Sequence, residues 1–437
     1  MSKRAAAIGL FLSASLLAAP ALAGVIGQNV PALPITAERI AQLPADQQPA
    51  WKAYLARSQA QMQADRAALA AELKPGETAP PPLPATAHGD GGMALHKAPA
   101  WYASPEARHI ADVIVSFQTP AGGWSKNQDR RGALRLPGQP WASDNSSQHL
   151  GKDDFDAPHS PRWSYVGTLD NNATITEMRF LAKVATQAPG PEGDAYRQSF
   201  LKGVHYLLAA QFPNGGWPQV WPLEGGYHDA ITYNDNAVSE AAALLTEVSE
   251  AKAEFAFVPA DLRAKAAEAA KWGRLCIVAT QIRVNGKLTL WGQQADPFTL
   301  EPVGARNFEP PALATSESAD LLLYLMSLPD PTPQEVRAVH WGVAWLNHHA
   351  IMGKEWTGKG QTDGRHLIDK TGAGPIWARY YDRKTEKPIF GDRDKSLHDN
   401  VDDISQERRD GYSWFGAQPL KVFKVYGDWV KTHPPGQ

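Results

Sequence analysis

Apolar side chains recur at helical spacing through the middle of the chain. The clearest segment follows Ser104, a residue type that caps helix N-termini, and Ile110, Val113, Ile114 and Phe117 form its stripe at positions i, i+3, i+4 and i+7. Further segments with this period are Ala173–Val184, Tyr196–Gln211, Ala237–Val248, Leu262–Gln281, Ala319–Met326 and Val336–Leu346. Long runs with the period of two that is typical of strands do not interrupt them. The pattern predicts a mainly α-helical region with long loops.

The pattern changes after residue 346, where helical periodicity gives way to Gly, Asp, Arg and aromatic residues. Ile376–Tyr381 and Lys387–Phe390 flank a polar turn at Asp382–Glu386, which predicts a small C-terminal β-hairpin. Pro388 cannot donate a backbone hydrogen bond, so we expect its strand at a sheet edge.

The first 23 residues have the pattern of a secretory signal peptide. Lys3 and Arg4 precede the apolar run Ala5–Leu17, and Ala21–Ala23 forms an A-x-A cleavage pattern. The apolar run is short for a membrane span, and a retained anchor is the alternative. We expect cleavage after Ala23, export to the periplasm or beyond, and no membrane attachment of the mature chain.

Residues 24–87 are expected to form an N-terminal helical arm and a connector. Thr36–Leu73 is rich in Ala, Gln, Glu and Arg and lacks Gly, which predicts one or two helices. Gly76–Ala87 is rich in proline and predicts a stiff connector. Residues 88–437 then form the main domain, and the arm either lies at its periphery or covers one end of it.

Two segments of the helical region repeat one another. Gln118–Trp124 and Gln211–Trp217 share the pattern Gln-x-Pro-x-Gly-Gly-Trp, and the polar, helix-opening clusters Asp170–Ala173 and Asn234–Ala237 follow them. A degraded third copy begins at Trp291. Helix pairs that each expose an apolar stripe must pack on one another. The repeat therefore predicts an incomplete α/α toroid-like barrel whose loops gather the polar clusters around a groove.

The composition narrows the classes of function. The chain has 43 basic and 46 acidic residues and a net charge of −3, so no basic excess indicates nucleic-acid binding. Its one cysteine, Cys276, lies in an apolar helical segment and is expected in the core. The sequence lacks HExxH, CxxC, Walker, GxGxxG and GxSxG motifs, which excludes zinc proteases, nucleotide hydrolases, dehydrogenases and α/β-hydrolases.

The repeated polar clusters are candidates for a metal site. Asp170, Asn171 and Asp235 offer two carboxylates and an amide oxygen at matched repeat positions, a hard, oxygen-rich set that suits Ca²⁺. The alternative is that these Asp and Asn residues only cap the helices that follow them.

Basic and aromatic residues supply candidate substrate contacts. Arg306, Lys370, Arg379 and Arg393 lie in loop or hairpin contexts and suit planar carboxylates, with ordinary surface ion pairing as the alternative. Trp217 follows two glycines and is a candidate platform for a sugar ring, with packing between repeats as the alternative.

Taken together, these segments resemble a known family, the pectate lyases of polysaccharide lyase family ten. The resemblance covers most of the chain from about residue 100 to about residue 420. The segments that carry it are Thr168–Thr174, Gln211–Trp221, Ile231–Ala237, Ala305–Pro311, Ile376–Asp382, Lys387–Asp394 and Ile404–Trp414.

The resemblance implies a helix-rich α/α toroid-like fold with a groove for the polymer. It also implies Ca²⁺-assisted β-elimination of polygalacturonate. In that reaction the proton on carbon 5 of a galacturonate is removed, the glycosidic oxygen on carbon 4 is expelled, and a 4,5-unsaturated oligogalacturonate is released.

The resemblance also implies roles for the candidate residues. By its place in the motif, Arg393 matches the arginine of the family that acts as the base. The residues that match its metal-binding and substrate-binding groups are Asp170, Asn171 and Asp235, and those that match its uronate-binding groups are Arg306 and Lys370.

An arginine base requires a neutral guanidinium group, although this side chain is almost always protonated. Contact with Asp392 or Asp394, which flank Arg393, would favour the charged form. We therefore expect both carboxylates to point away from it.

Other functions remain open from the sequence. A secreted α/α-barrel glycoside hydrolase would use Asp170 and Asp235 as its pair of carboxylates. A non-catalytic polysaccharide-binding protein would use its Trp side chains as platforms. The Gln-x-x-x-Gly-Gly-Trp segments also resemble the repeats of terpene cyclases, but the signal peptide argues against that class. We expect a monomer whose partner is polygalacturonate or its oligomers.

Overall fold

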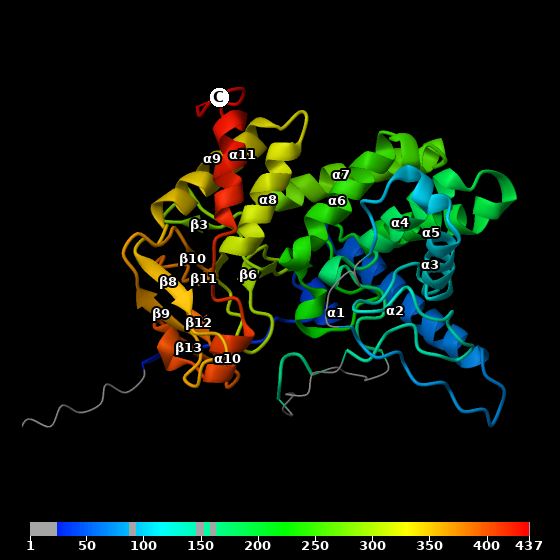
Figure 1. The fold of residues 1–437 in the computed structure, drawn as a ribbon, viewed down its shortest axis with the longest axis horizontal. Coiled ribbons are helices and arrows are strands. Elements are labelled where there is room, and N and C mark those ends of the chain that lie inside the picture. The colour runs from blue at the N-terminus through cyan, green and yellow to red at the C-terminus, as the bar shows by residue number, and fades with distance from the viewer. Residues whose placement is uncertain (1–23, 87–92, 146–152, 158–162, 437) are drawn as a thin grey trace, which may run out of the picture.

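The computed structural model describes residues 24–86, 93–145, 153–157 and 163–436. The predicted signal peptide lies outside these residues. The helices are α1 (Ala37–Ala41), α2 (Gln48–Ala71), α3 (Pro105–Ser116), α4 (Ile175–Gln187), α5 (Asp194–Ala210), α6 (Ala237–Ser249), α7 (Ala260–Ala279), α8 (Thr315–Ser327), α9 (Pro333–His348), α10 (Gln406–Gly411) and α11 (Pro419–Trp429) (Figure 1). Within the described residues, no helix is both long enough and apolar enough to cross a membrane.

The helices from α3 onward, apart from α10, form two layers. In the inner layer α4, α6, α8 and α11 follow one another, and in the outer layer α3, α5, α7 and α9 pack beside them. Because α3 and α11 lie towards opposite ends of this arrangement, the layers do not close into a ring (Figure 1). The fold is therefore mainly α, an incomplete α/α toroid, as the periodicity and the repeat predicted.

Local sequence signals place the helices close to where they were expected. Ser104 caps α3, since its side chain accepts a hydrogen bond from the backbone N–H of Ala107, and Pro105 occupies the first helical position. Each helical segment predicted after it also contains a helix.

A tryptophan that follows each outer helix ties the next loop to that helix. The indole Nε1 of Trp124 donates a hydrogen bond of 2.8 Å to Ile114 O in the last turn of α3. Trp217, Trp291 and Trp377 make the same bond to α5, α7 and α9, with Leu207, Ile277 and Leu346 as the acceptors. The helix–loop repeat is thus present four times in the described structure, once more than the sequence indicated.

The repeated glutamine connects successive outer helices. Its side-chain amide donates to a backbone carbonyl of the next outer helix in three copies: Gln118 to Ser199 in α5 at 2.9 Å, Gln211 to Ala269 in α7 at 2.8 Å and Gln281 to Ala338 in α9 at 3.0 Å. These bonds fix the spacing of the outer layer.

Glycines in the outer helices leave room for large side chains that pack against them. A Cβ atom at Gly273 of α7 would lie 2.7 Å from Cζ3 of Trp217, which is closer than carbon atoms pack. Gly203 of α5 and Gly342 of α9 are equally close to inner-layer side chains, namely Met178 and Leu322.

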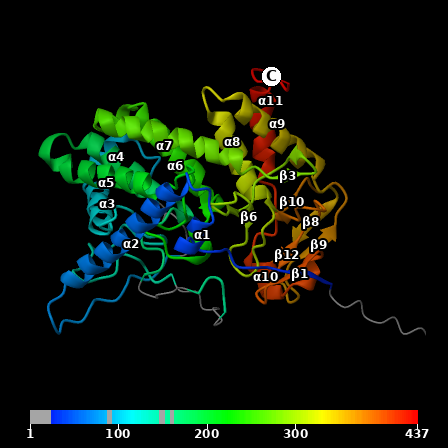
Figure 2. The same ribbon diagram turned by 180° about the vertical axis from the view of Figure 1, so that it is seen from behind.

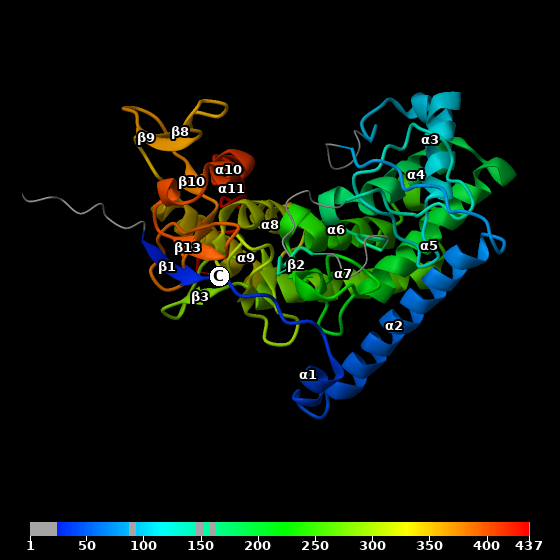
Figure 3. The ribbon, with the colours of Figure 1, turned by 90° about the horizontal axis from the view of Figure 1, so that it is seen from below.

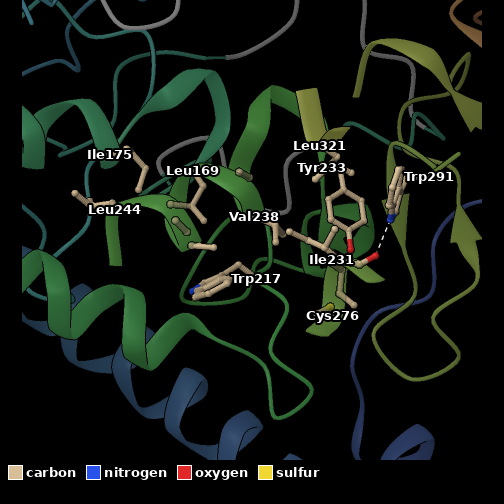
Figure 4. Packing of buried hydrophobic residues seen from close by; sticks show 14 of the residues in the cluster. Leu169, Ile175, Trp217, Ile231, Tyr233, Val238, Leu244, Cys276, Trp291 and Leu321 are labelled. Carbon is tan, nitrogen blue, oxygen red and sulfur yellow. Dashed lines mark hydrogen bonds between the residues drawn. The ribbon is translucent and has the colours of Figure 1, made fainter. Parts of the chain in front are cut away.

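Large apolar side chains fill the interior beside α6 and α7. Trp217, Tyr233 and Trp291 are fully buried there, and Cys276 lies among them (Figure 4). Burial raises the pKa of the Cys276 thiol to about 12, so it stays protonated and unreactive at neutral pH. The prediction that this cysteine is a core residue is confirmed.

The strands are short and lie in loops or in the C-terminal region. They are β1 (Val25–Gln28), β2 (Ile231–Thr232), β3 (Arg283–Val284), β4 (Lys287–Leu288), β5 (Gln294–Ala295), β6 (Pro302–Val303), β7 (Leu313–Ala314), β8 (Lys354–Thr357), β9 (His366–Asp369), β10 (Trp377–Ala378), β11 (Tyr380–Tyr381), β12 (Phe390–Gly391), β13 (Ser396–His398) and β14 (Phe415–Gly416). They pair antiparallel, in the orders β1-β13-β12 and β2-β5-β6 and in the pairs β3–β4, β7–β11, β8–β9 and β10–β14.

The predicted hairpin at residues 376–390 forms only in part. Tyr381 and Pro388 make one antiparallel bridge, next to a backbone hydrogen bond of 3.1 Å from Ile389 N to Tyr380 O. The flanking strands then pair elsewhere: β10 with β14, β11 with β7 and β12 with β13. Pro388 has no N–H with which to extend the ladder, which explains the short pairing.

The N-terminal arm packs along the outside of the helical layers. β1 joins the edge of β13, and α2 lies diagonally along the domain (Figures 2 and 3). Trp51 and Tyr54 of α2 contact Phe212 with ring centroids 5.5 and 5.1 Å apart, and the Tyr54 hydroxyl donates to Ala210 O at 3.0 Å. The arm therefore shares the core of the main domain.

Candidate functional site

A cavity of about 490 Å³ lies where the loops before α4 and α6 meet the loop at residues 305–309 and the C-terminal region. Most of its lining is polar. The predicted site residues that line it are Asp170, Asn171, Asp235, Arg306, Arg379 and Arg393. Six of the eight site residues predicted from the sequence thus line a single cavity in the structure.

Two matched turns carry the acidic side chains. Asp170–Asn172 precedes α4 and Asn234–Asn236 precedes α6, and both are single 3-10 turns. Asn171 and Asp235 have left-handed φ values of 52° and 49°, a conformation that Asn and Asp tolerate better than other side chains. The turns touch each other, since Asn171 N donates to a carboxylate oxygen of Asp235 at 3.3 Å.

The pKa values of the two carboxyl groups on these turns are shifted in opposite directions. Burial works against ionisation of Asp170, but the adjacent ammonium group of Lys126 holds its pKa well below the usual range. Burial and the neighbouring Asp170 carboxylate raise the pKa of Asp235. Two buried carboxyl groups this close ionise together only when a further positive charge lies between or beside them.

The oxygen atoms around these turns fit a hard divalent cation. Asp170 and Asp235 offer carboxylate oxygens, and Asn171 offers an amide oxygen on the same cavity wall. Gln219 lines the cavity too, and its buried Oε1 lacks a hydrogen-bond partner in the described part of the chain. Among the described residues, no group of three or more His, Cys, Asp or Glu side chains is placed to hold a metal ion, so water or ligand oxygens would complete the coordination of such an ion.

Arginine side chains also form part of the cavity wall, and Nη2 of Arg379 donates to Oδ1 of Asn234 in the second turn at 3.4 Å. The Nε and Nη2 groups of Arg306 donate hydrogen bonds of 2.9 and 2.6 Å to the carboxylate of Glu309. Arg379 forms an ion pair with Glu317. Burial works against both charges, but the paired glutamates raise the pKa of Arg306 and of Arg379 well above the usual range. Both groups therefore stay cationic.

Arg393 also lines the cavity and has an acidic partner of its own. Its Nε and Nη2 donate to the two carboxylate oxygens of Glu407 at 3.1 and 3.0 Å. Asp392 accepts from Ser405 and Asp394 from Ser396, so neither carboxylate contacts the Arg393 guanidinium. The expectation that these two aspartates point elsewhere is confirmed, but the sequence did not indicate Glu407.

Two residues proposed as substrate contacts do not line the cavity. Lys370 is exposed beyond the end of β9, where its ammonium group pairs with Glu355 at 2.7 Å. Trp217 is fully buried and its indole is bonded to Leu207 O, so packing between repeats, the alternative reading of this residue, describes its surroundings. The structure thus brings neither residue into this cavity.

Comparison with known proteins places this site in a family. Residues 118–423 match the family described as pectic acid lyase. The chain belongs to this family. No curated protein matches the chain.

Two solved structures resemble this pectic acid lyase. The family 10 polysaccharide lyase from Cellvibrio cellulosa is 30% identical, with a TM-score of 0.63 over 78% of this chain and 97% of that chain. A mutant of that enzyme in complex with trigalacturonic acid is 29% identical, with a TM-score of 0.63 over 78% of this chain and 98% of that chain. The chain is therefore a polysaccharide lyase with an α/α toroid-like fold.

Sequence reasoning missed several residues that line the cavity of this lyase, including Lys126, Gln219, Gln293, Glu309 and Tyr412. A signal for some of them was present. Each of the four tryptophans that bond to an outer helix, here called the helix-capping tryptophans, is followed two positions later by a residue that lines the cavity. These cavity residues are Lys126, Gln219, Gln293 and Arg379. Extending the repeat by two residues past each Trp would have located three of the missed residues.

Proposed function

We propose that this pectic acid lyase cleaves polygalacturonate by Ca²⁺-assisted β-elimination and releases 4,5-unsaturated oligogalacturonates. The observation that carries the proposal is the cavity itself, whose lining combines a pair of acidic turns with a set of arginines. Carboxylates suit a divalent cation, and guanidinium groups suit uronate carboxylates. The trigalacturonic acid bound to the Cellvibrio cellulosa mutant supports a uronate ligand.

Asp170, Asp235 and Asn171 would hold the cation. Bound Ca²⁺ supplies positive charge that neutralises the substrate carboxylate and acidifies the adjacent carbon 5. In the free enzyme Lys126 offsets part of the acidic charge at this wall, because its ammonium group pairs with Asp170 and lies 3.5 Å from the centre of the Tyr165 ring.

Arg306 and Arg379 would bind substrate carboxylates. Glu309 occupies Nε and Nη2 of Arg306, which leaves Nη1 for a ligand, and the side chain is 39% exposed. Arg379 pairs with Glu317 through Nη2, and its buried Nε has no partner in the described structure. Each glutamate thus fixes its arginine in place without using all of its donors.

Arg393 would remove the proton from carbon 5. The electron pair of that C–H bond forms the double bond between carbons 4 and 5. The bond from carbon 4 to the glycosidic oxygen breaks, and the oxygen leaves with the electron pair of this bond and takes up a proton from water. The Arg393 guanidinium pairs with Glu407 at 3.0 Å and lies over the Phe308 ring. An arginine must lose its own proton before it can accept one, so we expect turnover to rise as the pH increases from neutral to alkaline.

Absorbance in the ultraviolet tests the reaction, because the conjugated product absorbs and the substrate does not. We expect the mature protein mixed with polygalacturonate and Ca²⁺ to give a rise in absorbance that a chelator abolishes. Arg393→Ala should lower kcat by at least about a thousandfold, as expected for loss of a reacting group. An Arg393→Ala variant with near-normal turnover would rule out this residue as the base.

Lys370→Ala is the matched control. It also removes one basic side chain from the C-terminal region, but from outside the cavity. Its kcat and KM should stay within about twofold of wild type. A large rise in KM would restore Lys370 as a substrate contact.

New reducing ends without ultraviolet absorbance would identify a hydrolase instead, and Asp170 and Asp235 would then be its two carboxylates. Binding of oligogalacturonates without either signal would leave a polysaccharide-binding protein.

We also propose that the protein is exported after cleavage behind Ala23 and acts as a monomer. The basic, apolar and A-x-A pattern of the first 23 residues supports export. Cell fractionation with N-terminal sequencing tests the first statement, and light scattering on the purified protein tests the second. An uncleaved N-terminus in the membrane fraction would contradict export.

A further inference from the structure

The N-terminal arm meets the arginine wall of the cavity at Asn29, directly after β1. Asn29 is 4% exposed, and its side-chain amide donates to three backbone carbonyls, those of Arg306, Asn307 and Glu309, each at 3.0 Å. These carbonyls belong to the turn that carries Arg306 and its partner Glu309. One side chain from the arm therefore reinforces a turn that its own backbone bonds also close, from Glu309 N to Arg306 O at 2.9 Å and from Ala305 N to Glu309 O at 3.0 Å.

The same residue also contacts the loop of the proposed base. Asn29 N donates to Lys395 O at 2.7 Å, two positions after Arg393, and extends the pairing of β1 with β13. Asn307 completes the link, since its side-chain amide donates to Arg393 O at 2.7 Å. The turn at Arg306 and the loop at Arg393 are thus tied to each other and to Asn29 through buried backbone groups.

The packing around Asn29 leaves little room for another arrangement. A Cβ atom on Gly304 would lie 2.6 Å from Oδ1 of Asn29 and 3.0 Å from Glu309 O. Gly391 of β12 is equally close to the turn, because a Cβ there would lie 2.8 Å from the carbonyl carbon of Phe308. The arm, the turn and β12 therefore pack backbone against backbone.

We propose that Asn29 is a positioning residue for uronate binding, which rests on the function proposed above. It acts through Arg306: its amide keeps the turn at residues 305–309 in the conformation that points the guanidinium into the cavity. The family match begins at residue 118, so Asn29 belongs to a segment outside that match. The N-terminal arm then contributes to substrate binding in this chain, because it positions Arg306.

Steady-state kinetics on polygalacturonate with the full mature protein test the proposal. Asn29→Ala leaves the carbonyl of Asn307 without its donor and removes one of the two donors to the carbonyls of Arg306 and Glu309. The turn then loosens, so we expect KM to rise about tenfold while kcat falls less than about threefold. Gly304→Ala should raise KM to a similar extent, because its methyl group displaces the Asn29 side chain. Arg39→Ala is the control: it removes the arm's ion pair with Asp296, at 2.6 Å, and should leave KM unchanged.

A double variant separates positioning from general loss of stability. If Asn29 and Gly304 act through the same contact, Asn29→Ala/Gly304→Ala should have about the KM of either single variant. Effects on KM that multiply, or a KM that stays at the wild-type value in Asn29→Ala, would overturn the proposal. If Asn29→Ala does not fold, Asn29→Ser and Gly304→Ala carry the same test, with circular dichroism and thermal melting confirming the fold.

The outcomes for the two proposals are distinguishable. Wild-type protein without lyase activity on polygalacturonate would overturn the proposed function and this inference with it. Active wild-type protein whose KM is insensitive to Asn29→Ala would overturn this inference alone.

Discussion

Trp217 illustrates how a single residue can be assigned to the scaffold rather than to the groove. Its place after two glycines in a loop fitted a platform for sugar rings, yet the side chain is fully buried and its indole N–H is bonded to Leu207 O. The repeat explains this, since the same bond recurs at Trp124, Trp291 and Trp377. Whether a side chain is buried depends on the fold. The sequence motif therefore picked out Trp217 as notable, but could not show that its role is in packing.

Trp217→Phe should therefore affect stability and not catalysis. The change removes the indole bond to Leu207 O and leaves a small void, so we expect the free energy of unfolding to fall by about 2 kcal/mol. Urea denaturation measures this, and kcat/KM of the folded variant should match wild type. The control Trp272→Phe alters a side chain that is 49% exposed and should change the free energy of unfolding by less than about 0.5 kcal/mol. A selective rise in KM in Trp217→Phe would contradict this view.

Among the elements, the helices could be predicted and the small sheets could not. The apolar periodicity of an amphipathic helix extends over ten or more consecutive residues and is visible in the sequence, and capping residues such as Ser104 mark where the helix begins. Most of the described strands have only two residues, and the partners of some lie far away in sequence, as with β11 and β7. A pairing of this kind depends on tertiary packing, so local pattern gave a hairpin at residues 376–390 that forms only one bridge.

Glycines in the outer helices give a test at this scale. Gly273→Ala would gain helix propensity, worth about 1 kcal/mol, but its methyl group would lie 2.7 Å from the rigid Trp217 ring. We expect the clash to prevail and the free energy of unfolding to fall by about 1 to 2 kcal/mol. Gly427→Ala in α11 is the matched control, because nothing lies within 4 Å of its added Cβ, and it should stabilise the protein by about 0.5 to 1 kcal/mol. A Gly273→Ala variant more stable than wild type would show that the layers can move apart.

On the scale of the whole molecule, buried carboxyl groups lie where the arm meets the helical layers. Burial raises the pKa of Asp229 to about 7, although the backbone N–H groups of Gly225 and Ile35 oppose the shift. Burial likewise raises the pKa of Glu224 to about 8. Between pH 4 and these values the unfolded chain ionises while the folded chain keeps its protons, so each group lowers stability as the pH rises.

Asp229→Asn should remove part of this pH dependence. Asn keeps an oxygen that can accept from Gly225 N, which Asp229 binds at 2.9 Å, but it carries no charge at any pH. Relative to wild type, the variant should gain stability steadily from pH 5 to pH 7 and then level off, as followed by thermal melting across this range. The exposed Asp46→Asn should track wild type throughout. Parallel curves for Asp229→Asn and wild type would mean that Asp229 is ionised in the folded protein.

The candidate site was predictable where the repeat or a motif marked it. The turns with Asp170 and Asp235 occupy matched repeat positions, and Arg306 and Arg393 lie in recognisable segments. Glu309, Glu407 and Asn29 had no such signal, because each contributes through a contact that exists only after folding. Lys370 was placed in the site by a short, generic segment, and the structure puts it outside the cavity.

The four helix-capping tryptophans also have a consequence for how such a groove can change over evolutionary time. Each copy of the repeat anchors itself with its own Trp and, two residues later, contributes one side chain to the groove: Lys126, Gln219, Gln293 or Arg379. The Trp that anchors each copy and the cavity residue two positions later are different residues. A duplicated copy can therefore change its cavity residue while its Trp keeps the fold. Two copies now carry a cation and two carry an amide. Changing one of these side chains at a time would redistribute charge along the groove without rebuilding the scaffold, which makes them natural positions at which related enzymes can acquire different polymer preferences.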